Sequence, residues 1–245
     1  MQKLELGSTY DKVYLISRCF KGLFTHDISN IFHSISNAFE LCLILIKKEI
    51  ENEDIIEFFK LIEEQINRGK KLVNDFRKLT ELESSVLPLE PLDLVKTLTQ
   101  ATRFVQASFP FRKIDIKIDS EIKTAQVNAN DLLFDAFENV LINSINYNEN
   151  DLIQIVVSIS EITDFKREFL KLEFKDNGVG IEDTKKYEIL QEGHKKTKQS
   201  KGMGIGLSLI AILINLYDGK IWIEDRIRGD PSKGSNFVIL LPKVK

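Results

Sequence analysis

Apolar residues follow a helical period through the first third of the chain. From Phe20 to Leu45 they recur in steps of 4, 4, 3, 4, 3, 4 and 3 residues, which is the spacing of a coiled-coil seam. After a polar cluster at Glu51–Asp54, a second helix is expected, whose apolar stripe is Ile55, Phe59, Ile62, Ile66, Val73 and Phe76. Two antiparallel helices with one stripe each cannot close a core alone. Residues 1–86 are therefore expected to form a helical hairpin that dimerises into a four-helix bundle.

The pattern changes after the segment Ser84–Pro91, whose serines and prolines indicate a linker. Helices are expected at residues 93–108, 131–147 and 203–217, and alternating apolar positions predict strands at 114–118, 153–159, 169–174, 221–223 and 237–241. Helices mixed with hairpin-connected strands are typical of an α+β sandwich. The chain is thus expected to have an all-α domain at 1–86 and an α/β sandwich domain at 87–245.

Composition narrows the possible classes of protein. Hydrophobic residues make up 43% of the chain and charged residues 29%, which excludes a wholly disordered chain. The net charge of −3 gives no reason to expect a nucleic-acid partner. Cys19 and Cys42 lie far apart, without nearby histidine clusters, which argues against a disulfide framework or zinc site. No apolar run approaches the ~20 residues that span a bilayer, so we expect no membrane segment in this chain and a cytoplasmic location. A sensor or membrane region upstream of Met1 is left open.

The first chemical signal is a pair of asparagines within Glu138–Asn143. Asn139 and Asn143 are four residues apart on an expected helix and so share one face. Amide oxygens on one face can hold a hard cation such as Mg²⁺, which in turn holds phosphates. The alternative is a pair of solvated asparagines.

The second signal is the segment Asp176–Gly180, Asp-Asn-Gly-Val-Gly, which follows an expected strand. Gly178 and Gly180 allow the backbone to approach a ligand closely. Asp176 can accept a hydrogen bond from an exocyclic amine such as that of adenine. Because Asp-Asn-Gly is also a common turn, this segment alone leaves both readings open.

The third signal is a set of glycines that opens the last expected helix. Gly202, Gly204 and Gly206 precede Leu207, and free N–H groups at a helix N-terminus can bind phosphate. The polar segment Glu182–Lys201 before them is rich in lysine and predicts a mobile lid over a polyphosphate. Its lysines near the glycines are Lys195, Lys196, Lys198 and Lys201. A solvated charge run is the alternative.

In this order and spacing, the three signals resemble the Bergerat-type ATP-binding domain of sensor histidine kinases. The tail, with Asp218–Glu224 and Gly234–Phe237, continues the resemblance, which covers residues 89–245. The same ATP fold also occurs in heat-shock chaperones, type II topoisomerases, mismatch-repair ATPases and anti-sigma-factor kinases. The resemblance implies ATP and Mg²⁺ as the ligands of this domain.

It also implies a role for each matching residue. Asp176 would hold adenine, with Ser235 supporting the contact through water, and Asn143 with Asn139 beside it would hold Mg²⁺. The glycine amides would receive the phosphates, and a lid lysine would neutralise charge on the γ-phosphoryl group. The implied ATP-binding residues are Asn139, Asn143, Tyr147, Asp176, Gly178, Gly180, Lys195, Lys198, Gly202, Gly204, Gly206, Leu207 and Ser235.

The segment Phe24–Asn30 on the first expected helix resembles a histidine-kinase phosphoacceptor box. At about 100° per residue, His26 lies about 200° from Phe24, opposite the apolar seam, and Asn30 shares its outward face. An ordinary surface histidine is the alternative. The resemblance implies that His26 is phosphorylated, that Asp27 orients it and accepts its proton, and that Asn30 positions water for dephosphorylation of a partner.

The whole pattern predicts a homodimeric, ATP-dependent histidine kinase that passes its phosphoryl group to an aspartate of a response regulator, and that also acts as a phosphatase. The alternatives are a dimeric histidine phosphotransferase on a degenerate kinase scaffold, without ATP activity, and an anti-sigma-type kinase or chaperone ATPase. Three positions depart from the family pattern. Asn146 stands where Lys or Arg is frequent, Ile31 where Pro is usual, and Tyr187–Leu190 where a phenylalanine-rich box is usual.

Overall fold

The computed structural model describes residues 28–46, 55–67, 69–70, 73, 88–164, 167–191 and 205–244. The chain divides into two compact units, Met1–Val86 and Leu87–Lys245.

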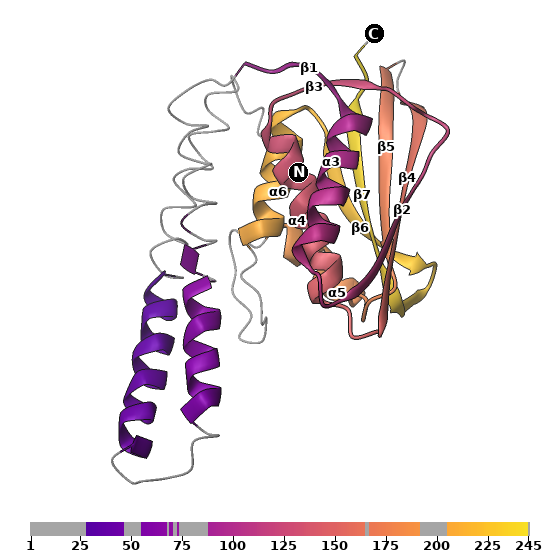
Figure 1. Cartoon of the computed structure of the whole chain (residues 1–245). Coiled ribbons are helices and arrows are strands. Elements are labelled where there is room, and N and C mark those ends of the chain that lie inside the picture. Colours follow the sequence, from indigo (N-terminus) through magenta and orange to yellow (C-terminus); the bar gives the residue numbers. More distant parts are fainter. Residues whose placement is uncertain are drawn as a thin grey trace. The chain divides into compact units, whose positions relative to one another are not determined.

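In the N-terminal unit, a helix at Ile28–Ile46 is followed by helical residues 55–67 (Figure 1). The expected seam of the first helix is confirmed over the described residues, because Ile31, Ala38 and Cys42 are buried. The two segments contact each other, since a Cβ atom on Gly69 would lie 3.6 Å from Cγ2 of Ile31.

Within one chain, the expected stripe of the second helical segment is only partly covered. Phe59, Ile66 and Val73 are exposed at 53%, 43% and 51%, whereas Phe58 is half-buried. The less exposed residues of this segment are 55, 58, 62, 65 and 69. Their spacing of three or four residues puts them on one face of the helix, next to the face of the expected stripe. Many large apolar side chains are left exposed on the two helical segments: Phe32, Phe39, Leu41, Leu43, Ile44, Ile46, Ile56, Phe59, Leu61, Ile66 and Val73.

By length and composition, the helix Ile28–Ile46 could cross a membrane, with a mean hydropathy of 1.3 over its best window. The sequence expectation concerned an unbroken apolar run of ~20 residues, which this helix does not contain, so it stays a prediction. The indication is weak, because core helices of soluble proteins and signal sequences also meet it. This helix also presents polar side chains, among them exposed Asn30, His33 and Glu40.

The C-terminal unit is built on a five-stranded sheet in the order β2-β4-β5-β7-β6. Its strands are β2 (Lys113–Asp119), β4 (Leu152–Asp164), β5 (Arg167–Asp176), β7 (Asp230–Pro242) and β6 (Lys220–Ile227). Strands β2 and β4 run parallel, and the other neighbours are antiparallel. Alternate residues such as Ile153, Ile155 and Val157 are buried on one face, as the period-2 pattern predicts. A separate two-stranded sheet pairs β1 (Glu90–Asp93) with β3 (Gln126–Ala129).

Three helices cover the buried face of the sheet: α3 (Leu94–Ser108), α4 (Leu132–Asn146) and α6 (Ile205–Leu216) (Figure 1). Helix α4 packs between the other two and against β4 and β5. The rings of Phe137 on α4 and Phe174 on β5 lie 5.9 Å apart between centroids, and both side chains are fully buried. Because α4 meets the end of β5, the expected asparagine pair and the Asp-Asn-Gly segment lie on neighbouring elements.

Three elements were not expected from the sequence. Strands β1 and β3 are four residues each, and the end of the expected linker, Glu90–Pro91, belongs to β1. Helix α5 (Asp183–Gln191) occupies the first half of the segment expected to be a lid. The chain nevertheless forms the α/β sandwich expected over the C-terminal unit.

Candidate nucleotide-binding site

Asp176, the last residue of β5, is 2% exposed and receives four hydrogen bonds. The backbone N–H groups of Gly178 and Ser235 donate to Oδ1 at 2.8 and 3.2 Å. The hydroxyl groups of Ser235 and Ser144 donate to Oδ2 at 2.6 and 3.3 Å. The expected Asp176–Ser235 partnership is thus a direct hydrogen bond. A buried carboxylate held in a fixed direction is suited to recognising an amine.

Glycines are required where three loops meet around this carboxylate. A Cβ atom on Gly178 would lie 2.6 Å from the carbonyl oxygen of Tyr147, and one on Gly180 would lie 1.6 Å from that of Pro231. Gly180 also has a φ of 72°, which L side chains rarely adopt. Gly234, which was not singled out as a site residue, has a φ of 107°, and its Cβ atom would lie 2.0 Å from the Asp176 carbonyl oxygen.

The side chain of Asn177 ties this loop to the start of β4. Its Oδ1 accepts hydrogen bonds from Asn148 Nδ2 at 2.7 Å and from the Gln154 N–H at 2.8 Å. Its Nδ2 donates to the carbonyl oxygen of Leu152 at 3.0 Å. We call Asn177 and Asn148 the asparagine clamp, because together they fix the loop that carries Asp176.

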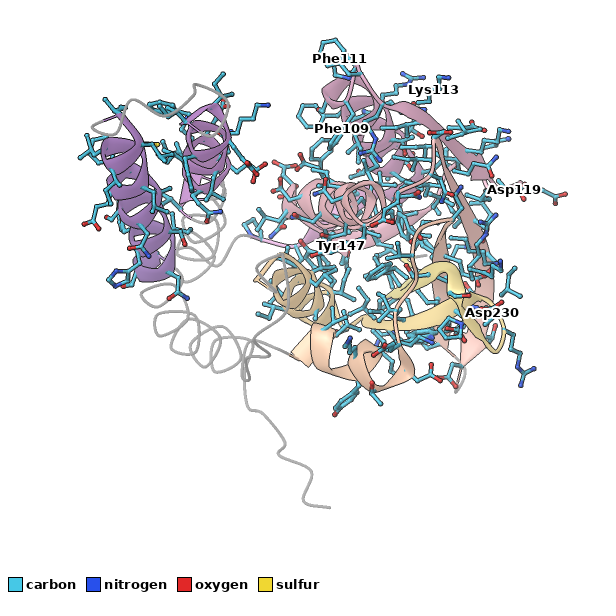
Figure 2. The ribbon with its side chains drawn as sticks, turned by 90° about the horizontal axis from the view of Figure 1, so that it is seen from below. Phe109, Phe111, Lys113, Asp119, Tyr147 and Asp230 are labelled. Atoms are coloured by element: carbon cyan, nitrogen blue, oxygen red, sulfur yellow. The ribbon has the colours of Figure 1, made fainter. Side chains whose placement is uncertain are left out.

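Helix α4 carries the expected asparagine pair one turn apart. Asn139 is 6% exposed and its Nδ2 donates to the carbonyl oxygen of Asp135 at 3.0 Å, while Asn143 is half-buried. Because the Asn139 amide nitrogen is used within the helix, its oxygen is the atom that remains to accept or to bind a cation. Tyr147, which is 48% exposed, follows the last turn of this helix (Figure 2).

This donor set fits Mg²⁺ bound together with a polyphosphate. The described residues contain no group of three or more His, Cys, Asp or Glu side chains that could hold a metal ion, so a fully protein-bound site is not formed by that part of the chain. Mg²⁺ typically takes only one or two protein oxygens and completes its shell with phosphate and water. Two amide oxygens from Asn139 and Asn143 meet that requirement.

Comparison with known proteins assigns the fold around this site. Residues 128–245 match the family model described as histidine kinase-, DNA gyrase B- and HSP90-like ATPase. The uncharacterized sensor-like histidine kinase ycf26 of Porphyra purpurea is 26% identical over 222 residues, which cover 82% of this chain and 34% of that protein. The autoinducer 2 sensor kinase/phosphatase LuxQ of Vibrio vulnificus is 24% identical over 196 residues, which cover 78% of this chain and 20% of LuxQ.

The C-terminal unit contains a histidine-kinase-type ATP-binding domain.

A solved structure agrees with this assignment at the level of the fold. The crystal structure of the histidine kinase ThkA in complex with the response regulator TrrA matches 93% of this chain and 64% of that chain, with a TM-score of 0.64 at 17% identity. The chain spans about a third of the length of the first curated relatives that it matches (34%).

In the kinase-type domain, the part expected to hold the phosphates is only partly described. Gly206 and Leu207 lie in the first turn of α6, and Leu207 is half-buried. Lys195, Lys198, Gly202 and Gly204 lie outside the described residues. The prediction that these four residues contact the phosphates therefore stays a prediction.

Helix α5 of the kinase-type domain is anchored to β6 by an ion pair. Lys186 contacts the carboxylates of Asp183, at 2.5 Å, and Asp225 on β6. Although burial favours the neutral amine, these two hydrogen bonds raise the pKa of Lys186 overall. Lys186 thus anchors the helix directly before Tyr187–Leu190, the segment that replaces the phenylalanine-rich box, while Tyr187 itself is 70% exposed.

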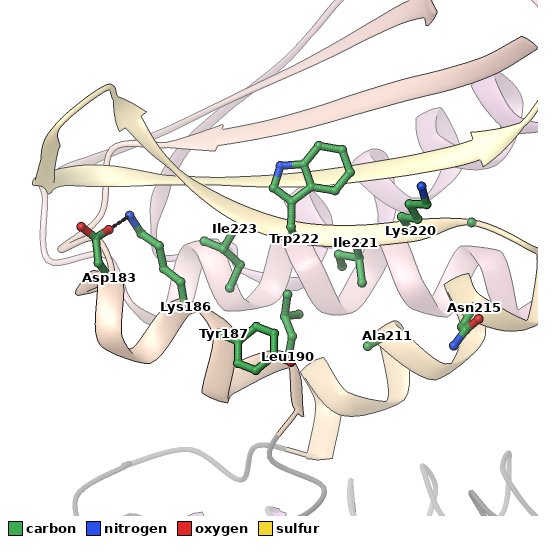
Figure 3. Close-up of a pocket in the computed structure, with 11 residues that line it drawn as sticks. Asp183, Lys186, Tyr187, Leu190, Ala211, Asn215, Lys220, Ile221, Trp222 and Ile223 are labelled. Atoms are coloured by element: carbon green, nitrogen blue, oxygen red, sulfur yellow. Dashed lines mark hydrogen bonds and ion pairs between the residues drawn. The ribbon is translucent and has the colours of Figure 1, made fainter. Parts of the chain in front are cut away.

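A cavity of about 550 Å³ lies between α5, α6 and β6 (Figure 3). Lys186, Tyr187 and Leu190 on α5 face Ile221 and Ile223 on β6 across it. Among the described residues, none of those expected to bind ATP lines this cavity, and Asp176 is not among its lining residues.

The expected phosphoacceptor box lies in the N-terminal unit. Asn30 is exposed on the helix Ile28–Ile46, as its outward direction predicts. His26 and Asp27 lie outside the described residues.

Sequence reasoning missed Ser144, Asn148 and Gly234 as site residues and passed over the side chain of Asn177. Ser144 and Asn148 are 3% exposed, which is unusual for small polar side chains unless they have buried partners. The available signal was their position near Asn143, which Ser144 follows directly and Asn148 follows after five residues. Nothing in the chain order indicates that Asn148 meets Asn177, because 29 residues separate them.

Proposed function

We propose that this chain is an ATP-dependent protein-histidine kinase that phosphorylates its own His26 and passes the phosphoryl group to an aspartate of a response-regulator receiver domain. The observation that carries the proposal is the Asp176 carboxylate, held by four donors at the end of β5 beside helix α4. A scaffold that had lost ATP binding would have no need of this arrangement. The similarity to sensor kinases over most of the chain supports the same assignment.

The residues of the kinase-type domain divide the work of binding ATP. Asp176 accepts a hydrogen bond from the adenine amine, and Ser235 holds the carboxylate in place. Asn143 and Asn139 hold Mg²⁺, which neutralises part of the phosphate charge when it is bound. The backbone amides near Gly202, Gly204 and Gly206 receive the phosphates, and Lys195 or Lys198 places a positive charge near the γ-phosphoryl group.

Phosphoryl transfer then requires His26 in line with the γ-phosphorus. A ring nitrogen of His26 forms the new N–P bond as the bond from the γ-phosphorus to its bridging oxygen breaks, and ADP leaves. Asp27 orients the ring and accepts the proton that His26 loses. The phosphohistidine then passes its phosphoryl group to the regulator's aspartate.

We also propose a phosphatase activity that depends on Asn30. An amide four residues after His26 lies one helical turn away on the same face, where it can direct a water molecule at the aspartyl phosphate of the regulator. The name of the similar LuxQ, a sensor kinase/phosphatase, supports the pairing of the two activities.

The partners follow from the surfaces of the N-terminal unit and from the relatives. The exposed apolar side chains of its two helical segments, such as Phe39 and Phe59, are suited to burial in a dimeric four-helix bundle, so we propose a homodimer. The neighbour ThkA is described in complex with a response regulator, which supports a receiver domain as the second partner. Because the proposed reaction needs ATP and a regulator, we propose that it takes place in the cytoplasm.

The test is labelling with γ-labelled ATP and Mg²⁺ of the native chain and of three variants. His26→Gln should abolish acid-labile label, and Asp176→Asn should abolish it by removing the negative charge and replacing one acceptor oxygen with an NH₂ donor, which opposes the adenine amine. His33→Gln is the matched control, because this histidine, seven residues after His26, is exposed on the helix Ile28–Ile46 and should keep native labelling. Label that persists in His26→Gln would move the acceptor elsewhere and end the proposal.

A further inference from the structure

The carboxylate of Asp176 has no spare acceptor site in this structure. Two oxygens offer about four lone-pair positions, and four donors fill them: the N–H groups of Gly178 and Ser235 and the hydroxyls of Ser235 and Ser144. An adenine amine that binds Asp176 must therefore displace a donor or share a position with one.

Three of the four donors are held firmly. The N–H groups of Gly178 and Ser235 belong to backbone that Gly178 and Gly234 bring into close approach, with no space for even a Cβ atom. The hydroxyl of Ser235 makes the shortest of the four contacts, at 2.6 Å. The hydroxyl of Ser144 makes the longest, at 3.3 Å, and it can turn away by rotation about one bond.

The direction of Ser144 departs from that of five other helical hydroxyls among the described residues. Hydroxyl groups in helices commonly donate to the carbonyl oxygen four residues earlier. Five side chains do so here, at 2.7–2.9 Å: Ser34, Thr97, Thr99, Thr102 and Ser108. Ser144 donates across to Asp176 instead, although the carbonyl of Val140 on its own helix offers the same alternative.

We propose that the Ser144 hydroxyl is an exchangeable donor that holds the adenine-amine position on Asp176 until nucleotide binds, and so sets the affinity of the site for bases with an exocyclic amine. This inference rests on the proposed binding of ATP at Asp176. On binding, the amine takes the acceptor position on Oδ2, and Ser144 turns to its own helix. Ser144 thus weakens the binding of adenine nucleotides and leaves bases without the amine unaffected.

The test compares two ligands on the full chain by titration calorimetry in the presence of Mg²⁺. One is ADP, and the other is purine riboside 5′-diphosphate, which has hydrogen in place of the amine. Ser144→Ala should tighten ADP binding by about three- to ten-fold, the range for one modest hydrogen bond, and leave the affinity for the second ligand unchanged. Thr102→Val is the matched control, because it removes a buried hydroxyl that donates within its own helix, and it should change neither affinity.

The outcomes separate this inference from the proposed function. ADP binding that weakens in Ser144→Ala, or that stays as in the native chain, overturns the inference, and so does an equal change for both ligands. Asp176→Asn tests the underlying site and should lose ADP binding. Native ADP binding in Asp176→Asn would overturn the proposed adenine contact itself, and the inference with it.

Discussion

The asparagine clamp provides the sharpest test of how the nucleotide loop is held. Asn177→Ala removes three hydrogen bonds, to Asn148, Gln154 and Leu152. At roughly 1 kcal/mol each they set an upper bound of about 3 kcal/mol. The bonds to the Gln154 N–H and the Leu152 carbonyl are exposed, so water can replace them, and we expect a loss of about 2 kcal/mol in the free energy of unfolding.

Fluorescence of Trp222 is a suitable assay, because it is the only tryptophan of the chain and lies on β6 of the C-terminal unit. A loss of about 2 kcal/mol should lower the melting temperature by roughly 4–8 °C for a domain of this size. Asn177→Asp keeps the acceptor oxygen but loses the donor to Leu152, and its melting temperature should lie between those of the native chain and Asn177→Ala. Asn146→Ala, at an exposed site just before the clamp, should melt within about 1 °C of the native chain. An Asn177→Ala variant that melts with the native chain would refute the clamp.

Three further predictions concern other contacts of the same domain. Gly234→Ala should destabilise the fold by more than about 2 kcal/mol, because its Cβ atom would lie 2.0 Å from a carbonyl oxygen. Gly229 is the matched control, because it has a φ of 80° but its Cβ atom would meet nothing within 4 Å. Gly229→Ala should therefore cost only about 1 kcal/mol in the same melting assay. Burial raises the pKa of Glu173, but a neighbouring amide and two lysines lower it overall from 4.5. The resulting stability is present above pH 4.5 and is lost as the pH falls through the lowered pKa, so the advantage in melting temperature over Glu173→Gln should shrink and disappear as the pH is lowered below 4.5. Asp225→Asn should release Lys186 and speed hydrogen exchange of the α5 amides by about tenfold, and unchanged exchange there would show that the ion pair does not anchor the helix.

Periodicity was sufficient to predict the elements that carry the site. The expected helix at 131–147 is α4 at Leu132–Asn146, and the expected strand at 169–174 is the centre of β5. Both contribute many fully buried side chains, such as Phe137 and Phe174, so burial reinforces the pattern at every turn. The positions of Asn139 and Asn143 on α4 and of Asp176 at the end of β5 could be predicted from the sequence for the same reason.

The elements that were missed have physical reasons in common. Strands β1 and β3 are too short for alternation to be visible. Helix α5 has no strong apolar face that a periodic pattern could reveal, and the ion pair of Lys186 with Asp225 helps to hold it instead. The parallel pairing of β2 with β4 depends on packing between segments remote in sequence. The contacts of Asn148 with Asn177 are equally remote, and no local pattern encodes them.

The donors around Asp176 explain why its loops carry so many small residues. Among the described residues, no ion pair includes Asp176; it is held only by the two N–H and two O–H groups described above. A cation beside it would neutralise the carboxylate in an ion pair, whereas neutral donors leave its negative charge unpaired, so that an amine can take the place of the Ser144 hydroxyl. Neutral donors must come very close to do this, which requires Gly178 and Gly234 at positions where a Cβ atom would meet backbone oxygen. The same residues are therefore needed for base recognition and for loop packing. A substitution that shifts these donors should change both the nucleotide affinity and the free energy of unfolding.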